Sequence, residues 1–115
     1  MTSNELESRK SRGESFIVAN DGQFLGKLTS NIYDLDSILN IYGLYGSQFS
    51  STSITNKYGL YGSPYSSLSP YNAYTSTPPI IYLKGMRYGY LSVNQFLFGC
   101  VNPLHIVEWM KYNGL

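Results

Sequence analysis

Short apolar stretches, each followed by a glycine-marked turn, occur near both ends of the chain and predict two β-hairpins. Phe16-Ile-Val18 precedes Asp21-Gly22, a dipeptide typical of a type I′ turn, in which both central residues need positive φ. Ile80-Ile-Tyr82 precedes Lys84-Gly85, which is a weaker form of the same signal. We therefore expect one hairpin before and one hairpin after the middle of the chain.

The two hairpin sequences are similar to each other. Residues 18–31 align without gaps with residues 81–94, sharing the pattern β-branched residue, x, x, x, Gly, x, x, x, Gly, x, Leu, Ser/Thr, x, Asn. Similar hairpins, at about 16–31 and 80–94, can pair in one small sheet.

A C-terminal helix is predicted over about residues 103–112. Asn102 is a suitable N-cap, Pro103 suits the first helical position, and Asn113-Gly114 ends the pattern. Apolar residues on one side of this helix would pack on the sheet. The expected fold class is α+β, mainly β.

The segment between the hairpins is repetitive and almost uncharged. Residues 37–52 and 53–68 are identical at eleven of sixteen positions, and a third copy begins at Ser69 and ends at Thr77-Pro78-Pro79. Such repetition indicates a repeated backbone conformation. We interpret each copy as Ser-capped turns, with Gly43 and Gly59 as left-handed caps. The copies would form a long ordered loop excursion between the hairpins and not a solenoid.

The first fourteen residues differ in composition from the rest. They are rich in charge, poor in apolar residues and without an apolar signal-peptide core, so we expect residues 1–14 to be a flexible arm and 15–115 to be a single domain. No apolar run is long enough for a transmembrane segment. As written, the chain is expected in the cytoplasm, or outside the cell if it is a mature or truncated form.

Composition excludes several classes of function. The 115 residues carry a net charge of +1, which removes the usual electrostatic case for binding nucleic acid or an anionic membrane. The lone Cys100 excludes an internal disulfide or a Cys-pair site. Cys100, His105 and Glu108 suggest a nucleophile and base, but an inert Cys and an ordinary helical His are favoured, so no enzyme is expected.

One oxygen-rich cluster precedes the first repeat. Asp34, Asp36 and Asn40 could hold Ca²⁺, although their spacing is not that of an EF-hand loop. The favoured alternative is that one of the aspartates caps the turn beginning at Ser37. We expect no other cofactor.

The repeats resemble sequence blocks found in a known group of proteins. Asp34-Leu-Asp36-Ser-Ile-Leu-Asn40, the two Tyr-Gly-Leu-Tyr-Gly-Ser units and Thr77-Pro78-Pro79 are similar to a group of small, uncharacterised bacterial proteins. Members carry tandem N-x-Y-G-x-Y-G-S-x-Y-S-S blocks flanked by Gly-rich strands, and many look exported, whereas we expect no signal peptide in this chain. The resemblance covers about Phe16 to Trp109; it implies a defined fold and no particular function.

The repeats also carry the candidate function. Tyr, Ser, Gly and Asn are typical of antibody-type binding loops, so we expect a non-enzymatic module that contacts a partner protein through Tyr45, Phe49, Tyr61 and Tyr65. In the alternative interpretation, the tyrosines of the repeats only pack the excursion. Base stacking would need a basic groove, which is missing. The alternatives are a self-associating structural protein, possibly with the cation, and a small inhibitor from a mobile element.

Overall fold

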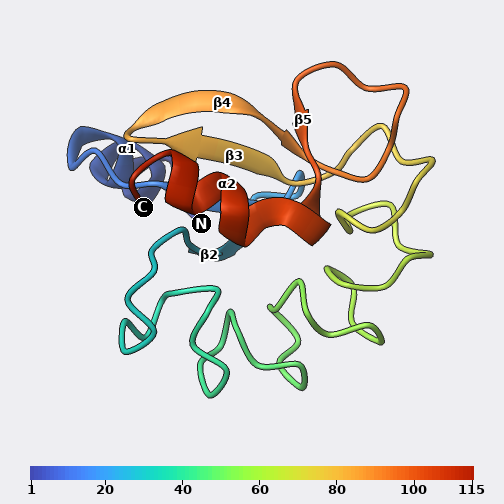
Figure 1. The fold of residues 1–115 in the computed structure, drawn as a ribbon, viewed down its shortest axis with the longest axis horizontal. Helices are drawn as coiled ribbons and strands as arrows, with labels where there is room; N and C mark the ends of the chain where they lie inside the picture. The colour runs from blue at the N-terminus through green and yellow to red at the C-terminus, as the bar shows by residue number, and fades with distance from the viewer.

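A five-stranded sheet forms the centre of the computed structural model, which describes all 115 residues (Figure 1). The strand order is β2-β1-β3-β4-β5, and every pairing is antiparallel except that of β4 with β5. Hairpins β1–β2 and β3–β4 lie side by side through β1 and β3, which confirms the α+β, mainly β class. The strands are β1 (Phe16–Val18), β2 (Phe24–Lys27), β3 (Ile80–Leu83), β4 (Met86–Leu91) and β5 (Cys100–Val101).

The two hairpin turns are of different types. Lys84 and Gly85 have φ of 51° and 86°, so the type I′ conformation occurs at the weaker signal. In the first hairpin only Gly22 has positive φ, 92°, so the expected type I′ turn at Asp21-Gly22 is wrong. Ala19 donates to the Gln23 carbonyl and so closes a loop of three residues, one more than a type I′ turn has. The left-handed Gly22 accommodates this extra residue.

Each hairpin is followed by a segment that returns parallel to its outer strand. Lys27 bridges Ser37 in parallel, and Tyr90 pairs in parallel with Cys100, so the two pairings are 63 residues apart, as are the aligned hairpins. Gly26 of β2 and Gly89 of β4 lie at the points where the returning segment passes close to the strand. An added Cβ would overlap Ile38 at Gly26 and the Gly99 carbonyl at Gly89. The fold therefore consists of two similar halves, each a hairpin with its returning segment, which pair with each other through β1 and β3.

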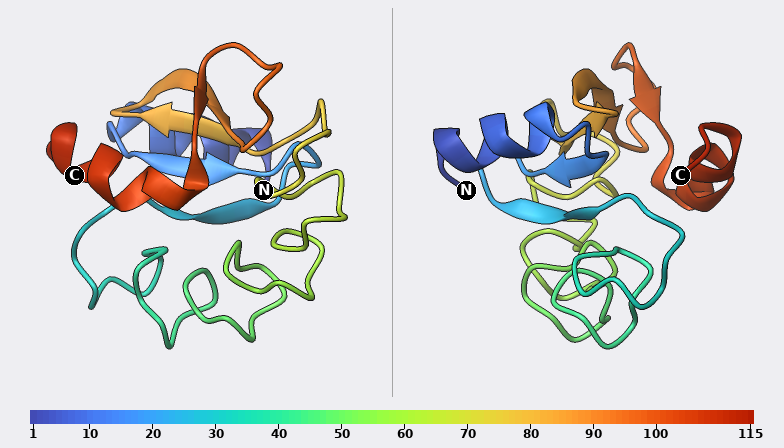
Figure 2. Two further views of the ribbon diagram at one scale, coloured as in Figure 1. Left: turned by 45° about the vertical axis from the view of Figure 1, so that its right-hand side comes forward. Right: turned by 90° about the vertical axis from the view of Figure 1, so that its left-hand side faces the viewer.

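Two helices cover opposite faces of the sheet (Figure 2). The expected C-terminal helix is present as a 3₁₀ turn, η1 (Pro103–His105), which continues into α2 (Ile106–Tyr112), and Asn102 Oδ1 accepts from the N–H of Leu104. Ile106 and Met110 of α2 join the larger core cluster on one face. No helix has the length and apolar character needed to cross a membrane.

The N-terminal residues, expected as a flexible arm, form helix α1 (Ser3–Ser11) on the other face of the sheet. Arg9 attaches this helix to the sheet. Its guanidinium lies 3.9 Å from the centroid of the Phe24 ring and 2.7 Å from a carboxylate oxygen of Glu14. Met1 and Leu6 add apolar contacts to the cluster around Phe16 and Phe24. The few apolar residues of this segment are thus used to cover one face of the sheet.

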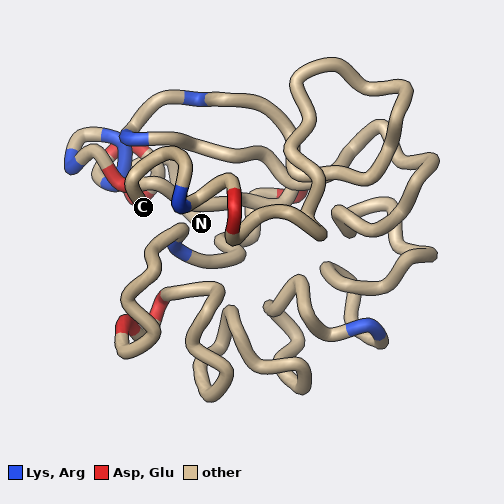
Figure 3. Tube along the Cα trace, viewed as in Figure 1, with Lys and Arg blue, Asp and Glu red and all other residues tan.

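The repeats run along the β2 edge and then rise beside the end of the sheet (Figures 1 and 2). Charged residues concentrate on α1 and around the sheet, whereas Lys57 is the single charge along residues 37–83 (Figure 3). The repeats therefore present an almost uncharged surface on one side of the molecule.

Candidate functional site: the aromatic repeat surface

The repeats are a chain of consecutive turns. From Asn31 to Thr75, a backbone N–H donates to the carbonyl three residues earlier at almost every third residue, with four-residue steps at Gly43 and Gly59. Four three-residue steps and one four-residue step make up each sixteen-residue unit. Neither Gly43 nor Gly59 has positive φ, so the expected left-handed caps are wrong; these glycines begin turns instead.

The side chain at the first position of each turn explains why the turn backbone is ordered. Each Asn or Ser oxygen accepts from the N–H two residues later, as Asn40 does from Tyr42 and Ser47 from Phe49. Such Asx and Ser turns give the backbone an alternative to helix or sheet hydrogen bonding. The same bond recurs at Ser37, Ser50, Ser53, Asn56, Ser63, Ser66, Ser69, Asn72 and Thr75.

Asparagine amides tie each turn to an earlier one. The Nδ2 groups of Asn40, Asn56 and Asn72 donate to the carbonyls of Asp34, Ser50 and Ser66, each six residues earlier, at 3.0–3.3 Å. Asn94, after the second hairpin, donates in the same way to the Thr75 carbonyl. The asparagines therefore satisfy backbone groups that no sheet or helix would satisfy.

Buried residues at equivalent positions fasten the repeats to the sheet. Ile38 and Ile54 are buried in the larger core cluster, and Pro70, their equivalent in the third copy, is also buried. Ser37, Ser53 and Ser69 beside them are fully buried. The Ser53 hydroxyl donates to the Tyr45 carbonyl, which links the second copy to the first.

Aromatic residues follow the turn asparagines and serines on the outside. Phe49 and Tyr65 are 84% and 92% exposed, and their N–H groups donate to Ser47 and Ser63. We call the exposed set that shares this turn position the aromatic row: Tyr42, Phe49, Tyr58, Tyr65 and Tyr74. The turns hold their backbones, so each ring projects from an ordered site.

The four sequence-predicted contact residues separate into two pairs. Phe49 and Tyr65 belong to the aromatic row, whereas Tyr45 and Tyr61 point inward. Tyr45 is half-buried with its ring edge-on to Phe24, and the centroids are 4.9 Å apart. Tyr61 is buried, and its hydroxyl donates to Asp21 Oδ2 at 2.8 Å. Tyr45 and Tyr61 therefore serve the fold. Sequence reasoning missed Tyr42, Tyr58 and Tyr74, which the recurring Asn-x-Tyr pattern marks.

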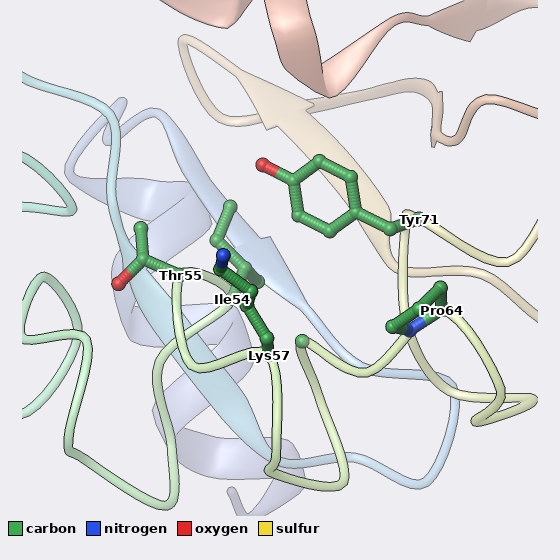
Figure 4. Close-up of a pocket in the computed structure, with 6 residues that line it drawn as sticks. Ile54, Thr55, Lys57, Pro64 and Tyr71 are labelled. Carbon is green, nitrogen blue, oxygen red and sulfur yellow. The ribbon is translucent and has the colours of Figure 1, made fainter.

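Grooves separate successive copies of the repeat. One, of about 610 Å³, includes Ile41, Gly46 and Gln48, and the next, of about 490 Å³, includes Lys57, Gly62 and Pro64 (Figure 4). These residues correspond one to one at an offset of sixteen. The two grooves share these positions of the repeat, whereas Tyr42, Ser47 and Phe49 line the first groove alone and Ile54 lines the second alone.

The oxygen-rich cluster is occupied by the chain's own donors. Asp34 accepts from the Asp36 N–H at 2.9 Å and from Lys27 Nζ at 3.0 Å, and both bonds lower the pKa of its carboxyl. Asp36 lies 3.6 Å from Arg9, and Asn40 donates to the Asp34 carbonyl. No group of three acidic, His or Cys side chains gathers here or elsewhere.

Cys100, His105 and Glu108 line one shallow depression beside α2. His105 Nδ1 lies 3.8 Å from a Glu108 oxygen, but both side chains are exposed. Burial raises the pKa of the Cys100 thiol, which lowers the fraction of thiolate. This arrangement favours an unreactive thiol.

Comparisons of the chain with family models, with curated proteins and with solved structures give no match.

Proposed function

We propose that the chain is a non-enzymatic binding module whose aromatic row contacts a partner protein. The observation that carries this proposal is the exposure of five aromatic rings on ordered turns, each ring two residues after a turn asparagine or serine. Phe49 and Tyr65 remain the central anchors, joined by Tyr42, Tyr58 and Tyr74.

The physics of association supports this use. Tyrosine and phenylalanine bury a large area at small entropy cost because they have only two side-chain torsions. The turns have already ordered the backbone, so less entropy is lost on binding. The surrounding residues are almost uncharged, and such a surface is inexpensive to desolvate.

Self-association through sheet edges has less support. At the outer edge of β2, the N–H and the carbonyl of Lys27 are bonded to Asp36 and Ile38, and β5 at the other edge has only two residues. Long, open edge strands are what pair between molecules.

Site-specific photo-crosslinking in the native host tests the proposal, with the crosslinker placed at Tyr58. With the crosslinker at position 58 and no other change, we expect one partner protein to crosslink to the chain. When Phe49→Ser and Tyr65→Ser are added, we expect this crosslink to be lost. The matched control is Phe98→Ser/Tyr112→Ser, which removes two rings that are 97% and 92% exposed outside the repeats. Equal crosslinking in both variants would refute the proposal, and a crosslink between two copies of the chain would favour self-association.

A further inference from the structure

The groove between the second and third copies differs from its equivalent at three positions that matter for binding. Lys57 stands where the first groove has Ile41, and Pro64 stands where it has Gln48. Thr55 lines both grooves, and Tyr71, its equivalent one copy later, lines the second groove alone. The turns that surround these positions repeat from copy to copy, so the differences between the two grooves lie in their side chains.

The second groove has apolar walls of a size that suits a small molecule. Its volume of about 490 Å³ lies within the usual range for ligand pockets. Ile54, which is buried, contributes from the second copy, and the Tyr71 ring extends from the third copy on the facing side (Figure 4). Pro64 adds a rigid apolar ring at one end. The planar Tyr71 ring favours a flat ligand body that can stack against it.

Two polar groups of the groove are free to contact a ligand. Lys57 is the single charge in residues 37–83, and its ammonium forms no ion pair. The Tyr71 N–H donates to Ser69 Oγ, whereas its hydroxyl points across the groove toward the side of Ile54 and Lys57. Burial raises the pKa of Tyr71 above the ordinary phenol value, which itself lies well above neutral pH, so the hydroxyl is protonated and can donate. A lone cation beside an apolar groove and a hydroxyl donor is complementary to one negative charge.

We propose that this groove binds a small aromatic monocarboxylate. The flat body lies between Tyr71 and Pro64 over Ile54, and the carboxylate accepts from Lys57. Neither Phe49 nor Tyr65 lines this groove, so the site is separate from the anchors of the proposed protein contact. Failure of one proposal therefore leaves the other standing.

A titration of the full chain followed by amide NMR tests the site with three probes: 3-phenylpropionate, its neutral amide 3-phenylpropionamide, and acetate. We expect saturable shifts at 54–57, 62–64 and 71 with 3-phenylpropionate. The amide should bind about tenfold more weakly, because a charge-assisted hydrogen bond is lost. Acetate should cause no saturable shift, because it lacks the apolar body.

The first copy supplies matched variants. Lys57→Ile installs the residue that the first groove has, and should weaken 3-phenylpropionate about tenfold or more while leaving the amide unchanged. Lys57→Gln removes the charge but keeps a polar side chain, and it should weaken 3-phenylpropionate binding as Lys57→Ile does. Ile41→Lys adds a charge to the first groove and should not create a second binding site there. Absence of saturable shifts, equal binding of acid and amide, or an undiminished affinity in both Lys57 variants would overturn the proposal.

Discussion

The Tyr61 hydroxyl donates a 2.8 Å hydrogen bond to the Asp21 carboxylate and so joins the second repeat to the turn of the first hairpin. Tyr45 occupies the equivalent position of the first copy, sixteen residues earlier. It packs on the other face of the sheet, edge-on to Phe24. Equivalent tyrosines thus fasten the repeats on both sides of β2, because the turn chain passes along that edge.

Removing the Tyr61 hydroxyl should destabilise the fold without altering its shape. Tyr61→Phe removes the donor to Asp21 Oδ2, whereas Asp21 Oδ1 still accepts from the Gln23 N–H. Because Asp21 is exposed, we expect a loss of about 0.5–1.5 kcal/mol. Denaturant unfolding measures this change. Tyr58→Phe, at a ring that is 96% exposed, is the control and should change the free energy of unfolding little. Equal effects of the two variants would contradict the role given to the Tyr61–Asp21 bond.

The same pair should make stability depend on alkaline pH. Burial and the Asp21 carboxylate raise the pKa of Tyr61 from 10.0 to about 12. The folded state therefore holds the phenolic proton more tightly than the unfolded state, so this contribution is complete below pH 10 and is lost as pH rises toward 12. Unfolding free energies measured across this range should fall less steeply for Tyr61→Phe than for the wild type. Parallel curves would show that the pair does not titrate this way.

Close packing of the turns predicts a strict requirement for glycine at one position in each of the first two copies. A Cβ at Gly62 would overlap the Asn56 carbonyl, as one at Gly46 would overlap the Asn40 carbonyl. Gly62→Ala should cost about 1–3 kcal/mol, because backbone and not a flexible side chain has to move. Gly59→Ala is the matched control, since its Cβ would meet only the Asn56 side chain, at 3.1 Å. Thermal unfolding that ranks the two variants in the opposite order would contradict this packing argument.

The attachment of α1 should weaken in acid. Burial alone would raise the pKa of Glu14, but hydrogen bonds and charges from Arg12 and Arg9 outweigh it and hold the pKa below 4.5. A lowered folded pKa gives stability that is present above pH 4.5 and is lost as pH falls through the folded value. Hydrogen exchange in α1 reports this change directly. Glu14→Gln should flatten the acid dependence, and an unchanged dependence in that variant would exclude Glu14 as its source.

Arg9→Met tests the attachment at neutral pH. It keeps an apolar stem over Phe24 but leaves Glu14 with Arg12 alone, and we expect a loss of about 2 kcal/mol. The comparison variant is Lys10→Met, which removes a charge from the same helix whose ion pair with Glu7 is largely exposed. Denaturant unfolding should separate the two, and similar losses would show that helix charge in general, and not Arg9, stabilises α1.

Local patterns predicted the hairpins and the C-terminal helix, because each depends on neighbouring residues, whereas the pairing of the hairpins was predicted from their similarity to each other. Phe16-Ile-Val18 and Ile80-Ile-Tyr82 are strands of one sheet, and Asn102 begins the helix as expected. The turn at Asp21-Gly22 was predicted wrongly because its loop is one residue longer than the dipeptide implies. Loop length is set by the register of β1 on β2, which a local pattern does not contain.

The orientation of the tyrosines could not be predicted from composition. Tyr61 and Tyr65 lie four residues apart in one copy, yet one is buried and the other is 92% exposed. Their difference comes from the turn chain: the Tyr65 N–H donates to Ser63, which places Tyr65 in the aromatic row. The docking of α1 depended on long-range contacts of Arg9 with the sheet and with Asp36, which no periodicity in the first fourteen residues indicates.

Turn asparagines should contribute through two separate hydrogen bonds, which graded substitutions can separate. Asn56 accepts from the Tyr58 N–H through Oδ1 and donates to the Ser50 carbonyl through Nδ2. Asn56→Asp keeps the acceptor and loses the donor, whereas Asn56→Ala loses both bonds, so we expect losses of about 1 kcal/mol and about 2 kcal/mol. Gln48→Ala, at an exposed side chain with no hydrogen bond in the chain, is the control. Denaturant unfolding should rank the variants in that order, and amide NMR of Asn56→Ala should show the largest shifts around Ser50 and Tyr58. If Asn56→Ala were as stable as the control, the turn backbone would be ordered by its own hydrogen bonds and the repeated asparagines would not be needed for the fold.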